Sequence, residues 1–333
     1  MFVGRRKLQI PGCPRQVHRF LGGRRSFLEL GAAAGAAALA PRWLRAQAAP
    51  PAGVIAQSRA TAATTPIKTT KLAGNVYLLQ GAGGNMAVQT GREGNVLIDS
   101  SFATAVPKIR EAIASISSDP ADAVINTHWH YDHTDGNEGM HAAGFNIFAH
   151  EKTRERLSTP QTMKMFGFTL PAAPAGALPV ITFSDALYAR HNGDTLDLVH
   201  FDPAHTDTDI YIHFHQADVL HVGDIWFNGF YPFIDESSGG SIGGMIRAGE
   251  KALAVAGPAT KIIPGHGPLG TKADLQKFHD MLATARDKMA ALKSAGASEQ
   301  EVLAKKPTAD LDAVWGKGFM GPDAFTGLVY RTL

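Results

Sequence analysis

The sequence predicts a mixed α/β or α+β domain. Strand-like and helix-like segments alternate along the body of the chain, and no internal repeat is visible. The chain has 333 residues, of which 44% are hydrophobic, so one large domain can bury a sizeable core. These observations set the fold class before any single motif is considered.

Short apolar segments between turn residues predict strands at 75–80, 85–90, 95–100 and 122–128. Residues 181–201 predict a hairpin with Asn192-Gly193 as its tight turn, because that dipeptide favours two-residue hairpin loops. Residues 209–224 predict two further strands.

Helical spacing of apolar residues predicts helices within 102–116, 242–253 and 275–292. Another helix is predicted to begin at Ser298, because Glu301 follows it at the capping-box spacing. Residues 151–179 mix prolines with methionine and phenylalanine, so we expect a loop or irregular insert there.

Residues 1–48 are typical of a twin-arginine export signal. Arg24 and Arg25 precede a weakly apolar run, and Ala46 and Ala48 offer a cleavage site. Glu29 interrupts the apolar run, so a cleaved signal fits better than the alternative, an uncleaved anchor. We therefore expect recognition by the twin-arginine export machinery, a periplasmic or secreted protein, and no stable membrane anchor after cleavage.

Residues 49–69 are predicted to be a flexible lead-in. The single cysteine, Cys13, lies in the predicted signal, so the mature protein would contain neither a disulfide nor a cysteine ligand.

The basic residues are concentrated in the predicted signal, which holds nine Lys/Arg and one acidic residue. The remaining chain has 23 basic and 29 acidic residues, a net charge of −6. An acidic body does not suit a protein that follows nucleic-acid phosphates, so we expect a small-molecule substrate and no nucleic-acid partner.

The segment "INTHWHYDHTDGN" (125–137) crowds ionisable residues at the end of a predicted strand. His128 and His130 are two residues apart and can bind one metal, whereas Asp132 and His133 can face a second. Each metal then needs more ligands. Three candidates lie in turns that follow predicted strands: His205, Asp224 and His266.

The order H-x-H-x-D-H, A-H-T, V-G-D and P-G-H-G resembles the metallo-β-lactamase-fold hydrolase superfamily. The segment "GNVLIDS", which contains Asp99, is similar to an early strand of that superfamily. The resemblance implies a four-layer αββα sandwich, with a catalytic domain over residues 70–295 and a C-terminal helical extension over 296–333.

The resemblance also implies roles for the clustered residues. The first metal would be bound by His128, His130 and His205, the second by Asp132, His133 and His266, and both by a bridging Asp224. Asp99 would support the site without binding metal. Two zinc ions are expected, although iron or manganese also accepts nitrogen and oxygen ligands.

The implied chemistry is hydrolysis by a hydroxide that bridges the metals, since metal binding lowers the pKa of water from 15.7 to about 7. Asp132 would both bind metal and orient this nucleophile. Candidate pocket residues come from the 151–179 insert and from the aromatic run 225–235, with core packing as the alternative for both segments: Met165, Phe166, Phe168, Trp226 and Tyr231.

The chain contains an internal comparison for the His-x-His spacing. His213 and His215 share it, but they alternate with apolar residues inside a predicted strand and no Asp-His follows. We interpret them as the polar face of a strand, which is also the alternative to metal binding for the first cluster.

The expected function is the opening of a cyclic amide or ester, a β-lactam or a lactone. Asp224 occupies the position of the cysteine ligand found in the best-known β-lactamases, which favours lactonase-like and thioesterase-like members. Export favours β-lactams and lactones, because glutathione thioesters are scarce outside the cytoplasm. The alternatives are a glyoxalase II-like thioesterase, a mononuclear-iron persulfide dioxygenase, and an exported metal-binding accessory protein without activity.

Overall fold

The computed structural model describes residues 53–333, which lie within one compact unit. The predicted export signal and its cleavage site lie outside the described residues. In residues 53–333, none of the helices is both long enough and apolar enough to cross a bilayer.

Two β-sheets form the centre of the described part of the chain. The seven-stranded sheet has the strand order β1 (Lys68–Ala73), β2 (Val76–Gln80), β3 (Met86–Gln89), β4 (Asn95–Ile98), β5 (Ala121–Ile125), β6 (Asn146–His150) and β9 (Ile181–Phe183). The five-stranded sheet has the order β10 (Ala186–His191), β11 (Asp194–His200), β12 (Ile210–Phe214), β13 (Val219–His221) and β14 (Lys261–Ile263).

Alternation along the strands sorts apolar side chains between two cores. In β4, Val96 and Ile98 face the second sheet, whereas Leu97 faces the outer helices. Ile212 and Phe214 of β12 meet the same inner core from the other sheet. The sheets therefore pack face to face, and each buries its outer face beneath helices.

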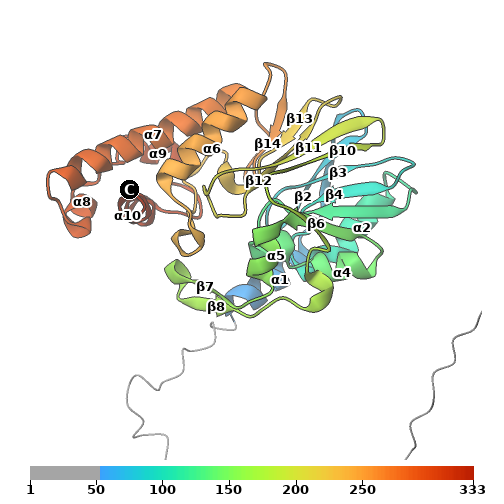
Figure 1. Cartoon of the computed structure of the whole chain (residues 1–333). Coiled ribbons are helices and arrows are strands. Elements are labelled where there is room, and N and C mark those ends of the chain that lie inside the picture. Colours follow the sequence, from blue (N-terminus) through green and yellow to red (C-terminus); the bar gives the residue numbers. More distant parts are fainter. Residues whose placement is uncertain (1–52) are drawn as a thin grey trace, which may run out of the picture. The chain divides into compact units, whose positions relative to one another are not determined.

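The outer helices complete an αββα sandwich (Figure 1). The seven-stranded sheet is covered by α2 (Val106–Ala114) and α4 (Asn137–Ala142), and the five-stranded sheet by α6 (Ile242–Val255) and α7 (Lys272–Ser294). The predicted four-layer fold is confirmed. The predicted strands, helices and Asn192-Gly193 turn also form, with positive φ at both turn residues.

The C-terminal region contains α8 (Glu299–Lys305), α9 (Asp312–Trp315) and α10 (Pro322–Arg331). The predicted Ser298–Glu301 capping box begins α8. Val302, Phe325 and Leu328 belong to the same apolar cluster as α6 and α7. This region is therefore helical, as predicted, and shares the core of the sandwich.

The predicted flexible lead-in is wrong over most of its length, because residues 53–64 form the helix α1 (Gly53–Thr64). Tertiary contacts hold the helix in place. Its side chains are small and show little amphipathic periodicity, so the sequence did not predict it. Ala62 is buried in the outer core, and Arg59 Nε donates to Asp135 Oδ2 at 2.9 Å.

The predicted irregular insert contains more regular structure than expected. It folds into α5 (Glu151–Leu157), a hairpin of β7 (Gln161–Met163) and β8 (Phe168–Leu170), and two 3₁₀ turns, η3 (Lys164–Phe166) and η4 (Ala175–Ala177). Arg156 anchors the end of α5, because its Nη2 donates to Asp207 Oδ2 at 2.7 Å. Tertiary contacts thus order this segment, whose prolines and short strands gave no recognisable helix or strand period in the sequence.

Candidate metal centre

The candidate metal centre lies where several strands of both sheets end. The loop after β5 carries the first histidine cluster and continues into the short helix α3 (Tyr131–Thr134). His205 lies in the β11–β12 connection, Asp224 in the 3₁₀ turn η5 (Gly223–Ile225) after β13, and His266 after β14. The fold therefore brings residues from distant parts of the sequence to one edge of the sandwich.

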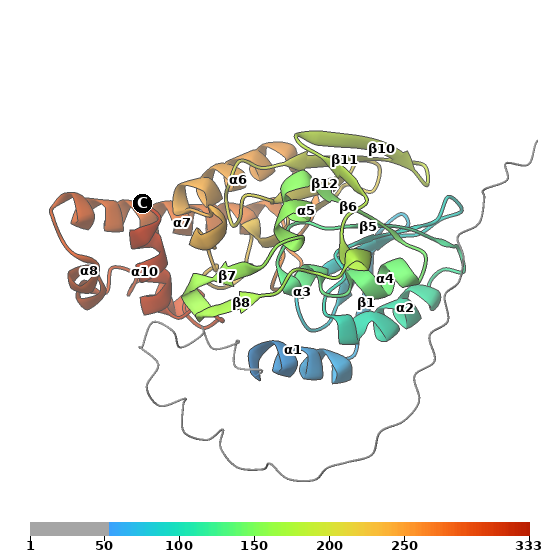
Figure 2. The same ribbon diagram turned by 60° about the horizontal axis from the view of Figure 1, so that its bottom comes forward.

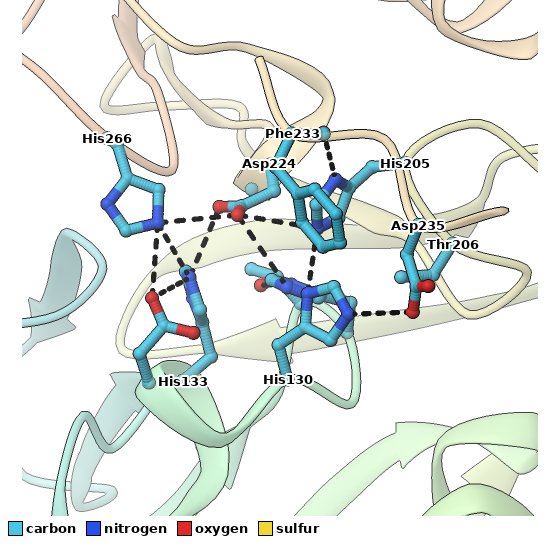
Figure 3. A network of polar contacts seen from close by, with 12 residues as sticks. His130, His133, His205, Thr206, Asp224, Phe233, Asp235 and His266 are labelled. Atoms are coloured by element: carbon cyan, nitrogen blue, oxygen red, sulfur yellow. Dashed lines mark hydrogen bonds and ion pairs between the residues drawn. The ribbon is translucent and has the colours of Figure 1, made fainter. Parts of the chain in front are cut away.

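The structure brings all seven predicted ligand residues together in two adjacent groups (Figure 3). One ligand atom from each member of a group lies within 4.8 Å of the others. The first group is His128, His130, His205 and Asp224, and the second is Asp132, His133 and His266. Asp224 also reaches the second group, with Oδ1 at 3.2 Å from His133 Nε2 and Oδ2 at 3.3 Å from His266 Nε2.

In each of four ligand histidines, one ring nitrogen lies within hydrogen-bond distance of a group outside the ligand cluster. His130 Nε2 lies 3.1 Å from Asp235 Oδ2, His133 Nδ1 lies 2.7 Å from Asp99 Oδ2, and His205 Nδ1 lies 2.8 Å from the Phe233 carbonyl oxygen. His128 Nδ1 lies 3.0 Å from Thr127 Oγ1. An outer acceptor holds a proton on the outer nitrogen, so the inner nitrogen of each ring, when the ring is neutral, presents its lone pair to the cluster.

The inner nitrogens approach one another closely. His130 Nδ1 and His205 Nε2 are 2.8 Å apart, and His133 Nε2 and His266 Nε2 are 3.4 Å apart. His128 Nε2 is buried and has no hydrogen-bond partner in residues 53–333. Lone pairs that face one another without a donor between them suit a cation, so the donor set fits metal binding.

The histidine pKa values differ between the two ligand groups. Burial lowers the pKa of His128 well below its ordinary value and lowers that of His205 to about 4, so both rings are neutral and able to bind metal. Burial also lowers the pKa of His266, but the carboxylates of Asp224 and Asp132 outweigh the effect of burial and raise this pKa to about 9. The pKa of His133 is raised in the same way. Protons on His133 and His266 therefore balance the negative charge of these carboxylates when no cation is present.

Asp99 supports the ligand loop from beneath. It is fully buried and accepts hydrogen bonds from the backbone nitrogen and hydroxyl of Thr127, at 2.7 and 2.8 Å, besides holding His133. Its backbone has a φ of 61°, which is unusual for a residue other than glycine. These hydrogen bonds keep the strained backbone in place and fix the orientation of His133.

Gly265 allows the β14 loop to approach Asp224. A Cβ atom at this position would lie 1.9 Å from Asp224 Oδ1 and 2.7 Å from the Gly223 carbonyl carbon. Any side chain would therefore push the loop away from Asp224, and His266 with it. The glycine before the last histidine is thus a steric requirement of the site.

The sequence did not point to Asp235 as part of the site, whereas Phe227 belongs to the aromatic run expected to contribute to the pocket. Asp235 is 105 residues from His130 in the chain, and its carboxylate also accepts a hydrogen bond from the Ser237 backbone nitrogen at 2.9 Å. Phe227 stacks on the His266 ring with centroids 5.2 Å apart. The aromatic run that ends at Asp235 was the only signal for either residue.

The prediction that Trp226 and Tyr231 line the substrate pocket is wrong. Both are fully buried, and the Tyr231 hydroxyl donates to Asp312 while its ring stacks on Phe325. Tyr231 thereby packs α10 against the core, and Trp226 lies in the same apolar cluster. Within the insert, Met165 is half-buried and Phe168 is buried, whereas Phe166 is exposed.

Comparisons with known proteins agree with this architecture. A family model described as the metallo-beta-lactamase superfamily matches residues 69–266. A search of curated proteins gave no match. Solved structures include a metallo-beta-lactamase from Pontibacter korlensis, with a TM-score of 0.54 and 18% identity over 65% of this chain and 99% of that chain.

A second similar structure is the sec-alkylsulfatase Pisa1 from Pseudomonas sp., with a TM-score of 0.63 and 18% identity. The match covers 82% of this chain but only 51% of the sulfatase. The DIM-1 metallo-beta-lactamase has a TM-score of 0.52 and 18% identity, over 66% of this chain and 98% of that one. At this identity the likeness concerns the fold.

The family match, the sandwich and the His/Asp cluster lead to one conclusion: the chain belongs to the metallo-β-lactamase superfamily, whose members are mostly metal-dependent hydrolases.

Proposed function

We propose that the protein is an exported hydrolase that binds two zinc ions and opens a cyclic amide or ester. The observation that carries the proposal is the pair of adjacent ligand groups bridged by Asp224. The first ion would be held by His128, His130 and His205, the second by Asp132, His133 and His266. When bound, the ions supply a water of lowered pKa and polarise the substrate carbonyl.

The side chains differ in their access to substrate. His128, His130, His133, His205 and Asp224 are buried, whereas the Asp132 and His266 side chains are each 22% exposed. Substrate therefore approaches from the side of Asp132 and His266. Asp132 Oδ2 lies 3.2 Å from His266 Nε2, so its carboxylate is positioned to orient water and to accept a proton.

An aspartate at position 224 favours a lactone or a thioester, whereas the proposed location outside the cytoplasm favours either a lactone or a β-lactam. Both considerations admit a lactone. A thioesterase, a mononuclear-iron dioxygenase and an inactive metal-binding protein remain distinct outcomes of the experiments below.

The assignment of the ligands predicts separate losses of metal. We expect about two zinc ions per chain in the metal-replete protein and about one in the His266→Ala variant, while His128→Ala disrupts the other site. Elemental analysis of gel-filtered protein measures the content. His215→Ala is the matched control, because His215 is exposed in the turn directly after β12 and does not belong to the cluster. Two ions retained in both site variants would contradict the assignment.

Removal of the metal should make stability depend on pH. In the metal-free protein His266 has a pKa of about 9 against an ordinary 6.5, so its contribution is complete below pH 6.5 and is lost as the pH rises to 9. We expect the Tm of chelated protein to fall between pH 6.5 and 9, and to fall less in metal-loaded protein, where metal replaces the proton.

The Asp132→Asn variant is the control for this effect, since it removes one carboxylate that raises the His266 pKa. Its chelated form should show a smaller fall in Tm over the same pH range. The charge balance would be contradicted by an equal fall in Tm in three samples: chelated Asp132→Asn, chelated unaltered protein and metal-loaded protein.

The reaction class is tested with a chromogenic β-lactam, a lactone and a thioester. We expect the lactone or the β-lactam to be hydrolysed, and Asp132→Ala to lower kcat about 10²- to 10⁴-fold, the range for loss of a group that transfers protons. Turnover of the thioester alone would indicate a thioesterase. One iron per chain would indicate the dioxygenase, and no turnover in zinc-replete protein would favour the accessory role.

Export predicts a processed N-terminus. Mass spectrometry of the protein from the periplasm or medium should give a mass that begins after Ala48, and Arg24→Lys/Arg25→Lys should keep it in the cytoplasm. An exported chain that begins at Met1 would contradict the cleavage.

A further inference from the structure

Phenylalanine rings extend from the metal centre to the protein surface. We call Phe166, Phe227, Phe230, Phe233 and Phe319 the aromatic rim. Phe233 lies in contact with two ligand histidines, with ring centroids 5.8 Å from His130 and 5.7 Å from His205. Figure 3 shows Phe233 beside His205. The rim therefore begins at the first ligand group.

One arm of the rim leaves the site through the β7–β8 hairpin. Phe233 lies 5.1 Å from Phe166, and Phe166 lies 5.7 Å from Phe319. These centroid distances are typical of packed aromatic rings. Figure 2 shows the hairpin close to the C-terminal helices that the Phe319 segment joins. A continuous series of aromatic contacts thus runs outward from the ligand histidines, from the buried Phe233 to the exposed Phe166 and Phe319.

The other arm starts at the exposed side of the cluster. Phe227 stacks on His266, and its ring lies 5.8 Å from that of Phe230. Gly318 passes so close to Phe230 that a Cβ atom would lie 2.4 Å from the Phe230 Cβ. Because Gly318 precedes Phe319, the same segment contacts both arms.

The outer end of the rim is open to solvent in the described structure. Phe319 is 71% exposed and Phe166 is 36% exposed, although most phenylalanines of the domain are buried. Phe319 also lies beyond residue 266, where the match to the family model ends. Phe166 lies within the matched residues and contacts Phe233 directly, whereas Phe319 lies outside them and contacts Phe166.

We propose that the aromatic rim binds an apolar group of the substrate, an alkyl chain or an aryl ring next to the bond that is cleaved. Its connection to His130, His205 and His266 places that group beside the ligand cluster. The exposed faces of Phe166 and Phe319 would then become buried only when substrate is bound. The identity of the cleaved bond rests on the proposed function, whereas binding of the apolar group does not.

Binding is tested without catalysis, using the neutral fluorescent probe N-phenyl-1-naphthylamine on both chelated and zinc-loaded protein. We expect Phe319→Ala and Phe166→Ala each to weaken probe binding about tenfold, since loss of part of an aromatic contact corresponds to roughly 1.4 kcal/mol. Tyr188→Ala is the matched control, because Tyr188 is 68% exposed on the edge strand β10. Equal probe affinity in all four proteins would overturn the proposal.

Turnover is tested with two lactones that share one ring, γ-valerolactone with a methyl group and γ-dodecalactone with an octyl chain. We expect Phe319→Ala to lower kcat/KM about tenfold for the octyl compound and to leave the methyl compound unchanged. An equal loss for both lactones would contradict a role in recognising the chain. If neither lactone is hydrolysed while Phe319→Ala still weakens probe binding, lactone hydrolysis fails as the proposed reaction and binding of an apolar group by the rim is supported.

Discussion

The structure depends on imidazole lone pairs and carboxylates that converge on a buried point without donors between them. Nitrogens of His130 and His205 lie 2.8 Å apart, and His128 Nε2 has no hydrogen-bond partner within residues 53–333. Such an arrangement is unfavourable unless positive charge lies among the groups. Protons on His133 and His266 meet this need in the absence of metal, and bound metal would meet it with better-directed bonds.

The surrounding structure keeps these groups from relaxing apart. Asp99, Asp235 and the Phe233 carbonyl hold the outer nitrogens, so each ring has a single usable orientation. The strained backbone of Asp99 and the close approach of Gly265 are local costs of this arrangement. The two sheets offset them, because their shared apolar core fixes the strand ends from which the ligand loops emerge.

The sandwich places the ligand residues, whereas the β7–β8 hairpin and the segment around Phe319 carry exposed aromatic side chains. The sandwich places the ligands at one edge, and the same framework serves a metallo-beta-lactamase and an alkylsulfatase in similar solved structures. The β7–β8 hairpin and the segment around Phe319 lie outside the ligand loops, and they meet where the Phe166 ring contacts the Phe319 ring. A division of this kind allows selectivity to change while the metal-binding residues stay the same.

The strand and helix pattern predicted a mixed α/β or α+β domain, and the resemblance of the short histidine motifs to a known superfamily implied the sandwich and the candidate ligand residues. Strand and helix periods are local properties, and the metal-binding residues follow strand ends in recognisable short motifs. Asp235 could not be predicted, since only the folded chain brings it to His130 across 105 residues. The burial of Trp226 and Tyr231, the order in α1, and the meeting of Phe166 with Phe319 were likewise decided by tertiary structure. Each depends on which side of an irregular segment meets the core, and no local period encodes that choice.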